Sequence, residues 1–353
     1  MHASLLLTLL ACGPRILFDA AIPDDGTFAR ATPDAATLAR FEAAAAYSEA
    51  HAGRGMMILQ GDVVMFEDEQ NNHLAETPTE LFSGTKSFSC AIALAAIEDG
   101  LLDLDELAVD TLDEWADDTE KSAIRVTDLL HFTSGLKEDF FALTLDGMYE
   151  EQRIEDKYAF AVAQPMVTPA GETFEYNGTH LPVFGEIITR KTGEDPLSYL
   201  EARVLDPITF RHAGWNHDPS GNPMLAFGAW TTTNEWAKYG VLVRDDGAWQ
   251  GTQVLPAGQF DTCFVGSESM PAYGLAFWLN EELTAAQAEE VPVGGIVGGQ
   301  RVFPSAPADL VVAAGANDNR LYISRSLGLV VVRVSDRDIL WRDDAFLALL
   351  FGD

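Results

Sequence analysis

The chain has few cationic residues. Its 353 residues include 22 Lys and Arg against 55 Asp and Glu, which gives a formal net charge of −33 at pH 7. Nucleic-acid binding needs clustered positive charge, so we expect no nucleic acid among the partners. The acidic residues are spread along the chain rather than gathered in a tail, which is typical of a solvated surface kept soluble by charge repulsion.

Cysteine is also scarce. The three cysteines, Cys12, Cys90 and Cys263, have no metal-ligand spacing and do not pair off evenly, so we expect no disulfide framework and interpret Cys90 as a core residue. The chain contains no H-E-x-x-H, and His212 with His217 is better explained as incidental than as a metal site. We therefore expect no metal and no other cofactor.

The N-terminus carries only a short apolar run, Leu5 to Ala11, which is too short to span a bilayer. It ends in Leu9-Leu10-Ala11-Cys12, which resembles a lipoprotein cleavage box, although no Lys or Arg precedes the run and Leu10 is bulky for its position. We interpret residues 1–30 as a signal or anchor segment with a linker. Export to the periplasm or cell envelope is the expectation, with any membrane attachment through this N-terminus only.

Strand-like segments occur at both ends of the chain. After a helix predicted from Ala35 to Ala50, the runs "GMMILQ" and "VVMFED" flank Gly61-Asp62 and predict a hairpin. Near the C-terminus, "ADLVVAAGA", "NRLYISR" and "LGLVVVRVSD" predict strands, and "WRDDAFLALLFG" predicts a helix. We expect one sheet assembled from both chain ends.

Helical segments dominate the middle of the chain. Residues from about 101 to 252 therefore form a mostly helical lobe in our prediction, inserted into an α/β part made of 31–100 and about 253–353. No internal repeat or low-complexity linker separates them. We expect residues 31–353 to form a single split domain.

Two segments carry the spacing S-x-x-K, in which a serine hydroxyl and a lysine amine can act as nucleophile and base. They are Ser83-Gly84-Thr85-Lys86 and Ser134-Gly135-Leu136-Lys137. About one such match is expected by chance in a chain of this length, so the context has to separate them. The chain lacks G-x-S-x-G, which excludes the nucleophile elbow of the α/β-hydrolases as a competing serine site.

The context favours Ser83. Residues 86–97 are apolar apart from the lysine and two serines, which predicts a helix buried on nearly every side. Ser83 would lie at its start, where free N–H groups and the helix dipole favour a developing negative charge. Lys86 would enter the same apolar setting, and bringing its pKa near neutral requires about 4 kcal/mol of desolvation and neighbouring positive charge.

Ser134 is placed the other way round. It follows the helical segment "VTDLLHF" and precedes Gly135, so it would lie near a helix C-terminus, where the dipole opposes an alkoxide. Its lysine is followed by Glu138 and Asp139, which would keep the ammonium charged. We interpret Ser134 as a loop or cap residue.

Three ordered segments resemble the serine β-lactamase-related family. They are "LFSGTKSFSCAIALAAIEDGLLDLDE", "IRVTDLLHFTSGL" and "GETFEYNGTHLPVFGEIITRKTGEDPLSYLEARVLDPI". This family contains class C β-lactamases, penicillin-binding D,D-peptidases, esterases and amide hydrolases such as the 6-aminohexanoate-oligomer hydrolases. The segment "DPSGNPMLAFGAWTTTNEWAKYGVLVRDDGAWQG" looks most like the esterase and amide-hydrolase branches. The resemblance implies an α+β fold of the β-lactamase/transpeptidase type, with an antiparallel sheet flanked by helices and a mostly helical lobe.

The resemblance also implies roles for particular residues. Ser83 would be the acylated nucleophile and Lys86 its proton-accepting partner. Tyr176 matches the tyrosine of the Y-x-N motif, which passes a proton to the leaving group. The N–H groups of Ser83 and Ala316 would form the oxyanion hole, where one donor is worth about 3 kcal/mol of barrier.

The sequence departs from the family pattern at two motifs. Asn177 comes one place early in Y-x-N, and Gly178 occupies the usual asparagine position. The third motif, K-T-G or H-x-G in many members, aligns best with Ala313-Ala314-Gly315. Gly315 allows close backbone approach, whereas Ala313 lacks the charge that helps to hold a substrate carboxylate in penicillin-recognising members. We still expect Asn177, Ala313 and Gly315 to face the substrate.

The sequence therefore predicts a metal-free serine hydrolase that cleaves a small ester, amide or peptide bond through an acyl-enzyme. One alternative is a D,D-peptidase or weak β-lactamase, which would need a basic residue from elsewhere, such as Arg320. Another is a catalytically silent binding module that keeps the fold. The oligomeric state stays open, and four aromatic residues are candidates for the lining of an acyl pocket: Trp230, Trp236, Tyr273 and Trp278.

Overall fold

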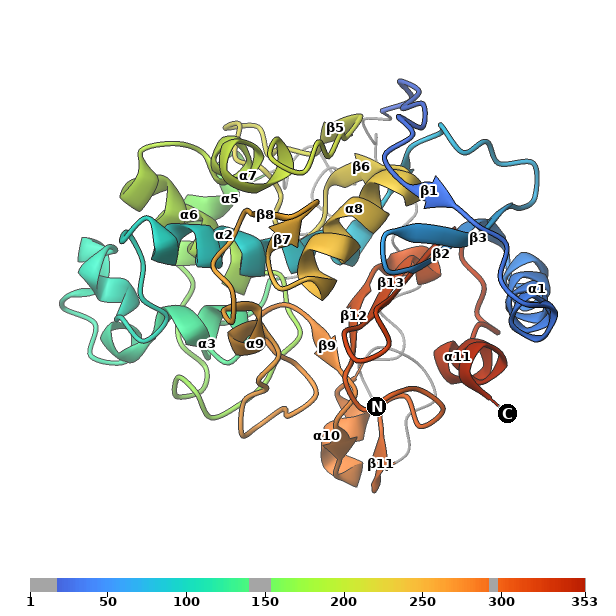
Figure 1. Cartoon of the computed structure of the whole chain (residues 1–353). Coiled ribbons are helices and arrows are strands. Elements are labelled where there is room, and N and C mark those ends of the chain that lie inside the picture. Colours follow the sequence, from blue (N-terminus) through green and yellow to red (C-terminus); the bar gives the residue numbers. More distant parts are fainter. Residues whose placement is uncertain (1–17, 140–153, 292–297, 353) are drawn as a thin grey trace.

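The two ends of the chain meet in one sheet, as predicted. The computed structural model describes residues 18–139, 154–291 and 298–352 (Figure 1). Its largest sheet has seven strands in the order β1-β3-β2-β14-β13-β12-β9, and its neighbours are antiparallel except for the parallel pair β1–β3. The strand bounds are β1 Ala29–Arg30, β2 Gly53–Gln60, β3 Val63–Glu69, β9 Trp278–Leu279, β12 Leu310–Ala314, β13 Arg320–Ser324 and β14 Leu329–Ser335.

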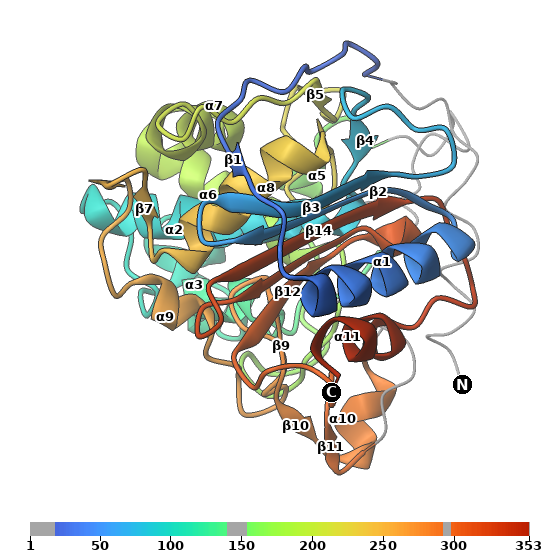
Figure 2. The same cartoon turned by 45° about the vertical axis from the view of Figure 1, so that its right-hand side comes forward.

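The central strands are buried on both faces because helices cover the sheet on both sides. Every residue of β13 and β14 is buried, which explains why these strands are almost continuously apolar instead of alternating. Helix α8, Thr233–Arg244, packs on one face against β2, β13 and β14. Helices α1, Ala35–Ala50, and α11, Asp343–Phe351, lie side by side on the other face (Figure 2).

The predicted helices are present at the expected places. Helix α1 begins after Asp34, whose carboxylate accepts hydrogen bonds from the N–H groups of Ala36 and Thr37. The other α-helices are α2 Phe88–Glu98, α3 Val126–Leu130, α5 Lys157–Val162, α6 His180–Thr192, α7 Pro196–Leu200, α9 Phe260–Cys263 and α10 Ala285–Glu289. Short 3₁₀ helices span Phe82–Ser87, Ala108–Asp110, Asp113–Trp115, Lys121–Ala123 and Ala316–Asp318, and a π-helix spans Glu201–Leu205.

Helix α2 occupies the centre of the molecule. Its residues from Phe88 to Ala96 are all buried, and it contacts α6 and α7 of the lobe as well as α9, which follows the lobe in the chain. The division of the chain into sheet part and lobe stays a prediction, with one qualification. Helix α8, which we assigned to the lobe, lies on the sheet.

Smaller sheets connect the lobe to the start of α2. One has the order β4-β6-β5, and its strand β4, Thr79–Glu80, leads directly into the 3₁₀ helix Phe82–Ser87. The other small sheets of the described residues are the β7–β8 hairpin and the antiparallel pair β10–β11. The bounds are β5 Gly214–Trp215, β6 Ala229–Thr231, β7 Ala248–Trp249, β8 Thr252–Gln253, β10 Glu282–Leu283 and β11 Gln300–Arg301.

The expectation that no disulfide forms was wrong. Cys90 of α2 and Cys263 of α9 form a disulfide with a Cα–Cα distance of 6.2 Å, across 173 residues of sequence. Both side chains are fully buried, so Cys90 is a core residue, as predicted. The uneven count misled the prediction because three cysteines can form one pair and leave one over; the third, Cys12, lies outside the described residues.

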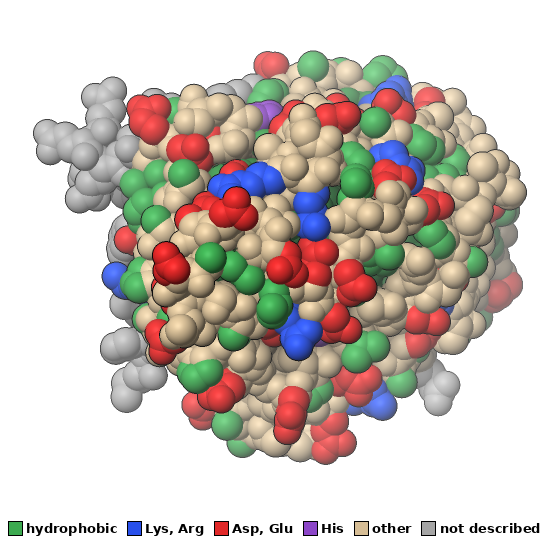
Figure 3. Space-filling view, turned by 90° about the vertical axis from the view of Figure 1, so that its left-hand side faces the viewer, with side chains coloured by type: hydrophobic (Ala, Val, Ile, Leu, Met, Phe, Trp, Pro, Cys, Tyr) green, Lys and Arg blue, Asp and Glu red, His purple; other side chains and the backbone are tan. Residues whose placement is uncertain are grey.

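Acidic side chains are scattered over one face of the molecule (Figure 3). Figure 3 shows them spread across the face formed by the helical lobe, with Lys and Arg between them, rather than collected in one patch. Within the described ranges, no helix has the length and apolar character needed to cross a membrane. The predicted signal or anchor segment falls mostly on residues 1–17, outside the described residues.

Candidate active site

Ser83 lies in a buried turn and is itself accessible. From Leu81 to Cys90 every residue is buried except Ser83. Phe82, directly before it, has a left-handed φ of 49°, a conformation that costs a bulky residue about 1–3 kcal/mol and that clusters at functional sites. The prediction placed Ser83 at the start of α2, but α2 begins at Phe88, and Ser83 belongs to the preceding 3₁₀ helix.

Lys86 is one turn further along the same 3₁₀ helix and contacts Ser83. Its Nζ donates to Ser83 Oγ at 3.0 Å and to the carbonyl oxygen of Ala226 at 2.7 Å. The side chain is buried, and burial lowers the pKa of Lys86 from 10.5 to about 7. A substantial fraction of Lys86 is therefore neutral near pH 7 and can accept the Ser83 proton.

Tyr176 approaches the same serine from the segment before α6. Its hydroxyl is hydrogen-bonded to Ser83, and Lys86 Nζ lies 5.1 Å from the centre of its ring. Burial raises the pKa of Tyr176 to about 12, although the Ser83 hydrogen bond acts in the opposite direction. The pKa of Lys86 thus lies near neutral and that of Tyr176 well above it, which suits Lys86 to accept a proton and Tyr176 to donate one.

Gly315 brings the end of β12 against the Ser83 turn. A Cβ atom on Gly315 would lie 2.0 Å from the carbonyl oxygen of Leu81, so only glycine fits this approach. Neither the Ser83 N–H nor the Ala316 N–H donates to a protein acceptor within the described part of the chain. These two N–H groups, carried by the two contacting segments, are the donors that we predicted for the oxyanion hole.

Ala313 and Asn177 are placed near the site by the chain but have other contacts. Ala313 is a buried residue of β12. The amide of Asn177 is buried and accepts from Thr179 N at 2.9 Å while it donates to Glu175 at 3.3 Å. Their contact with a substrate stays a prediction.

The four candidate aromatic residues are all buried, and two of them contact Tyr176. The ring of Trp278 lies 5.5 Å from the Tyr176 ring, and that of Tyr273 lies 5.9 Å away and perpendicular to it. Trp236 packs under Gly84, and Trp230 belongs to β6. Trp278 and Tyr273 therefore support the tyrosine rather than stand as isolated core residues.

The sequence analysis missed some contacts that hold the site, namely those made by Asn319 and by Arg320, which it had named only as a possible substrate-binding residue. Asn319 Nδ2 donates to the carbonyl oxygen of Glu80 at 2.9 Å, and Arg320 donates to the carbonyl oxygen of Gly315 at 2.8 Å. Arg320 is buried and also pairs with Asp343 at 2.6 Å. The only sign of these contacts in the sequence was the pair of polar residues Asn319 and Arg320 at the start of an apolar segment. Their partners could not be predicted because they are distant in sequence.

Within the described ranges, no group of three or more His, Cys, Asp or Glu side chains is arranged to hold a metal ion. His212 instead pairs with Glu201, and His217 contacts the carbonyl oxygen of Trp215.

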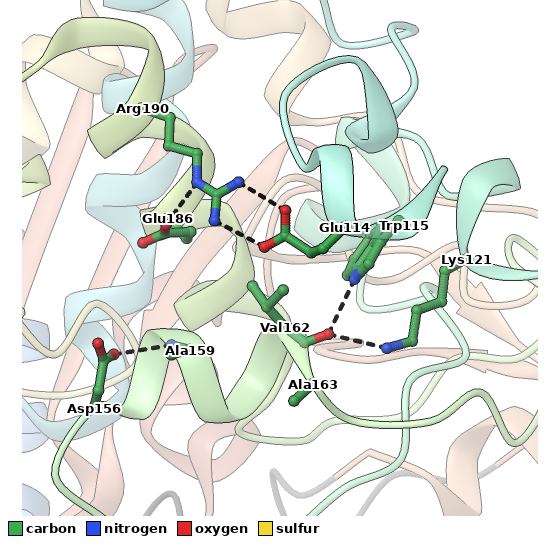
Figure 4. Close-up of a pocket in the computed structure, with 9 residues that line it drawn as sticks. All are labelled: Glu114, Trp115, Lys121, Asp156, Ala159, Val162, Ala163, Glu186 and Arg190. Atoms are coloured by element: carbon green, nitrogen blue, oxygen red, sulfur yellow. Dashed lines mark hydrogen bonds and ion pairs between the residues drawn. The ribbon is translucent and has the colours of Figure 1, made fainter. Parts of the chain in front are cut away.

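A pocket in the helical lobe is lined by charged groups that already have partners. Arg190 lies between Glu114 and Glu186 and bonds to both (Figure 4). Lys121 donates to the carbonyl oxygen of Val162. We assign no activity to this pocket.

Comparison with known proteins identifies the family to which the chain belongs. Residues 38–322 match the family model described as Beta-lactamase. A curated relative, the monacolin J acid methylbutanoyltransferase of Aspergillus terreus, is 29% identical over 152 residues. This match covers 38% of the chain and 37% of the relative, so the chain spans little more than a third of the length of that protein.

Solved structures share the fold over most of the chain. A protein described as a 6-aminohexanoate-dimer hydrolase, from Bacillus anthracis, has a TM-score of 0.68 at 16% identity, covering 90% of this chain and 84% of that one. A penicillin-binding protein homologue from Caulobacter crescentus has a TM-score of 0.66 at 16% identity, covering 90% and 96%. At these identities the likeness shows the fold, which confirms the predicted β-lactamase/transpeptidase-like architecture.

Proposed function

We propose that the chain, which belongs to the Beta-lactamase family, is a serine hydrolase that cleaves an ester or amide bond through an acyl-enzyme on Ser83. The observation that carries the proposal is the contact between Ser83 Oγ and a buried lysine amine at 3.0 Å, with the pKa of that lysine lowered to about 7. A serine hydroxyl is a weak nucleophile until an adjacent base removes its proton. The position and the lowered pKa of Lys86 suit it to remove the Ser83 proton.

Acylation would begin when Ser83 Oγ attacks the substrate carbonyl carbon and its proton passes to neutral Lys86. The carbonyl oxygen becomes an oxyanion, which the N–H groups of Ser83 and Ala316 would stabilise. Collapse of this intermediate breaks the bond to the leaving group, which takes a proton from Tyr176. Lys86 returns a proton to the tyrosine, so the serine proton ends on the leaving alcohol or amine.

Deacylation would repeat these roles with water as the nucleophile and Ser83 Oγ as the leaving group. A water molecule attacks the acyl carbon and gives a proton to neutral Lys86, and the second oxyanion occupies the same two N–H groups. The bond to Ser83 Oγ then breaks, Oγ takes back a proton, and the acid is released. An alcohol in place of water would give acyl transfer, which is the reaction type in the name of the Aspergillus terreus relative.

Two features favour a simple ester or amide over a substrate that the protein must bind through the substrate's own carboxylate. Ala313 is uncharged where many penicillin-recognising members have a basic residue. Arg320, the candidate replacement, is buried and bonded to Asp343 at 2.6 and 3.1 Å. A D,D-peptidase or β-lactamase activity is therefore the weaker proposal.

The free N–H groups of Ser83 and Ala316 argue against a catalytically silent module. A fold kept only for binding has no need of a base beside Ser83 or of two backbone donors that lack a protein acceptor within the described part of the chain. The strained φ of Phe82 points the same way, because such conformations persist where function requires them.

Labelling with a fluorophosphonate tests the proposal. We expect one label per chain on wild type and none on Ser83→Ala, with Ser134→Ala as the matched control that labels fully. Hydrolysis of a panel of p-nitrophenyl esters, anilides, D-Ala-D-Ala peptides and nitrocefin then ranks the substrate classes, and we expect esters or anilides to lead. An esterase rate that survives in Ser83→Ala would reject the proposal.

We also propose that the protein is exported. The disulfide between Cys90 and Cys263 supports this, because disulfides persist mainly in oxidising compartments such as the periplasm. Fractionation of cells that express the full chain, with mass spectrometry of its N-terminus, tests both export and lipid attachment at Cys12. Recovery of the uncleaved chain from the cytoplasm would argue against export.

A further inference from the structure

Arg320 is a buried cation next to the candidate active site. It is the first residue of β13, and only 4% of its surface is exposed. Its guanidinium makes a two-point contact with the carboxylate of Asp343, at 2.6 and 3.1 Å. The remaining terminal nitrogen, Nη1, donates to the carbonyl oxygens of Gly315 at 2.8 Å and of Asn319 at 3.0 Å. Burial of a guanidinium carries a large desolvation cost. We therefore ask what the contacts of Arg320 with Asp343, Gly315 and Asn319 do for the candidate site.

The contact with Gly315 acts on the candidate oxyanion hole. The carbonyl of Gly315 and the N–H of Ala316 are the two ends of one peptide unit. This unit is planar and trans, so its N–H points opposite to its C=O, and a group that holds the oxygen also sets the direction of the N–H. A charged donor on the oxygen further polarises the amide, which makes the N–H a stronger donor.

Asp343 in turn keeps Arg320 in place. It is the first residue of α11, is 3% exposed, and accepts a hydrogen bond from the Tyr322 hydroxyl at 2.6 Å. A guanidinium held at two points by a carboxylate has little freedom to turn. The C-terminal helix therefore fixes the arginine from the side opposite to Gly315.

We propose that Arg320, held by Asp343, is a positioning residue that orients and polarises the Gly315–Ala316 peptide so that the Ala316 N–H is aimed at the oxyanion. The inference rests on the proposed function, since it assumes that this N–H binds an oxyanion. It gives Arg320 a role different from the carboxylate-binding role of our alternative hypothesis. Arg320 would act on the transition state without touching the substrate.

Substitution of Arg320 should weaken stabilisation of the oxyanion and leave substrate binding almost unchanged. Lysine at position 320 keeps the charge but cannot hold Asp343 and Gly315 in the same fixed geometry. We expect Arg320→Lys to lower kcat on a p-nitrophenyl ester by about tenfold to a hundredfold, with KM changed by less than about threefold. Asp343→Asn, which keeps the shape and weakens the grip on Arg320, should lower kcat in the same direction by a few-fold.

The matched test substrate is the thionoester of the same acid. Its tetrahedral intermediate places sulfur, a weak hydrogen-bond acceptor, where the ester places oxygen, so its rate depends less on the Ala316 N–H. We therefore expect both variants to lose more ester than thionoester activity, so that the ester-to-thionoester rate ratio falls by at least about fivefold in Arg320→Lys. A purely structural role of Arg320 would lower both rates equally.

Arg244→Lys is the control variant. Arg244 is a similarly buried arginine that donates to a carbonyl oxygen, that of Gly61, and pairs with Asp62 and Asp245. None of these partners belongs to the candidate site. We expect this variant to keep the wild-type ratio, with urea unfolding used to compare the stabilities of the variants.

An unchanged ratio in Arg320→Lys and in Asp343→Asn would overturn the inference while leaving the proposed function intact, provided that the wild-type rate depends on Ser83. Should Arg320→Lys fail to fold, the ratio in Asp343→Asn alone decides. A wild-type ester rate that survives Ser83→Ala would overturn the inference together with the proposed function.

Discussion

The two S-G-x-K segments of this chain have opposite surroundings. At the first, Lys86 is buried and its Nζ lies 3.0 Å from Ser83 Oγ, while Ser83 itself is accessible. At the second, Ser134 is fully buried and Lys137 is exposed. One segment presents a serine with a buried base, and the other buries the serine and leaves its lysine in solvent.

Ser134 has a histidine as its partner instead. Its Oγ lies 2.9 Å from Nδ1 of His180, and Nε2 of His180 lies 3.0 Å from the carbonyl oxygen of Glu175. Because a carbonyl only accepts, Nε2 carries the proton and Nδ1 accepts from the Ser134 hydroxyl. Burial lowers the pKa of His180 to about 4, which keeps the ring neutral. A buried, fully bonded pair of this kind supports packing and is closed to a substrate.

The comparison teaches that spacing alone does not make a nucleophile. Both segments fulfil the same pattern, yet only one combines an accessible hydroxyl with a desolvated amine. The prediction of Ser134 as a loop residue near a helix end is confirmed, since α3 ends at Leu130 and Ser134 follows in a bend.

The largest difference between the segments should appear in the activities of their lysine variants. We expect Lys86→Ala to lower kcat/KM on a reactive ester by about a thousandfold, because it removes the base that accepts the Ser83 proton. Lys137→Ala is the control and should keep the wild-type rate. Steady-state kinetics of the two variants measure the effect, and equal losses would erase the distinction between the segments.

The pH dependence should carry the signature of Lys86. Its folded-state pKa is about 7, and only the neutral amine can accept a proton, so the protonated enzyme is inactive at lower pH. We expect kcat/KM to fall about tenfold per pH unit below about 7 and to level off above it. Ser134→Ala should show the same profile. A profile with no inflection between about pH 6 and 8 would contradict the assignment of Lys86 as base.

Stability should change in the opposite sense to activity at Lys86. We expect Lys86→Met to raise the free energy of unfolding by about 2–3 kcal/mol at neutral pH, because a buried amine is replaced by an apolar side chain. Between pH 7 and 10.5 the unfolded chain binds the lysine proton and the folded chain does not, so wild-type stability rises with pH there. The advantage of Lys86→Met should therefore shrink across this range.

Urea unfolding at several pH values measures this difference, with Lys137→Met as the exposed control expected to change stability by less than about 0.5 kcal/mol. A Lys86→Met advantage that does not depend on pH would show that the native pKa of the lysine is not lowered.

The smallest effect should come from Ser134. We expect Ser134→Ala to lower the free energy of unfolding by about 1–2 kcal/mol, since Nδ1 of buried His180 loses its donor. Ser83→Ala leaves no comparable buried acceptor unpaired and should change stability less. Urea unfolding compares the two, and a Ser83→Ala variant that is the less stable of the pair would reverse the comparison.

Much of the fold could be predicted because its signals are local. Helix α1 has the predicted bounds, and the strands β12, β13 and β14 lie within the predicted runs. Strands β2 and β3 contain their predicted runs and extend beyond them by two residues and one residue. Short strands without a pattern of their own, such as β9, escaped prediction because their pairing with β12 depends on residues more than thirty positions away.

The candidate site was predicted in part. The sequence indicated Ser83 and Lys86 through the apolar segment that follows them, and Tyr176 and Ala316 through a resemblance to a family. It did not indicate the carbonyl of Ala226, which binds Lys86 Nζ from 140 residues away. Every residue type has a backbone carbonyl, so the identity of residue 226 gives no indication of this contact.

The sequence by itself determined the order of the elements, the apolar burial around Lys86 and the choice of Ser83 over Ser134. These follow from neighbours in the chain, through periodicity and the hydrophobic effect. Only the tertiary structure decided the pairing of Cys90 with Cys263 and the direction of Arg320 toward Gly315. Both depend on where distant segments pack, and local composition does not encode that packing.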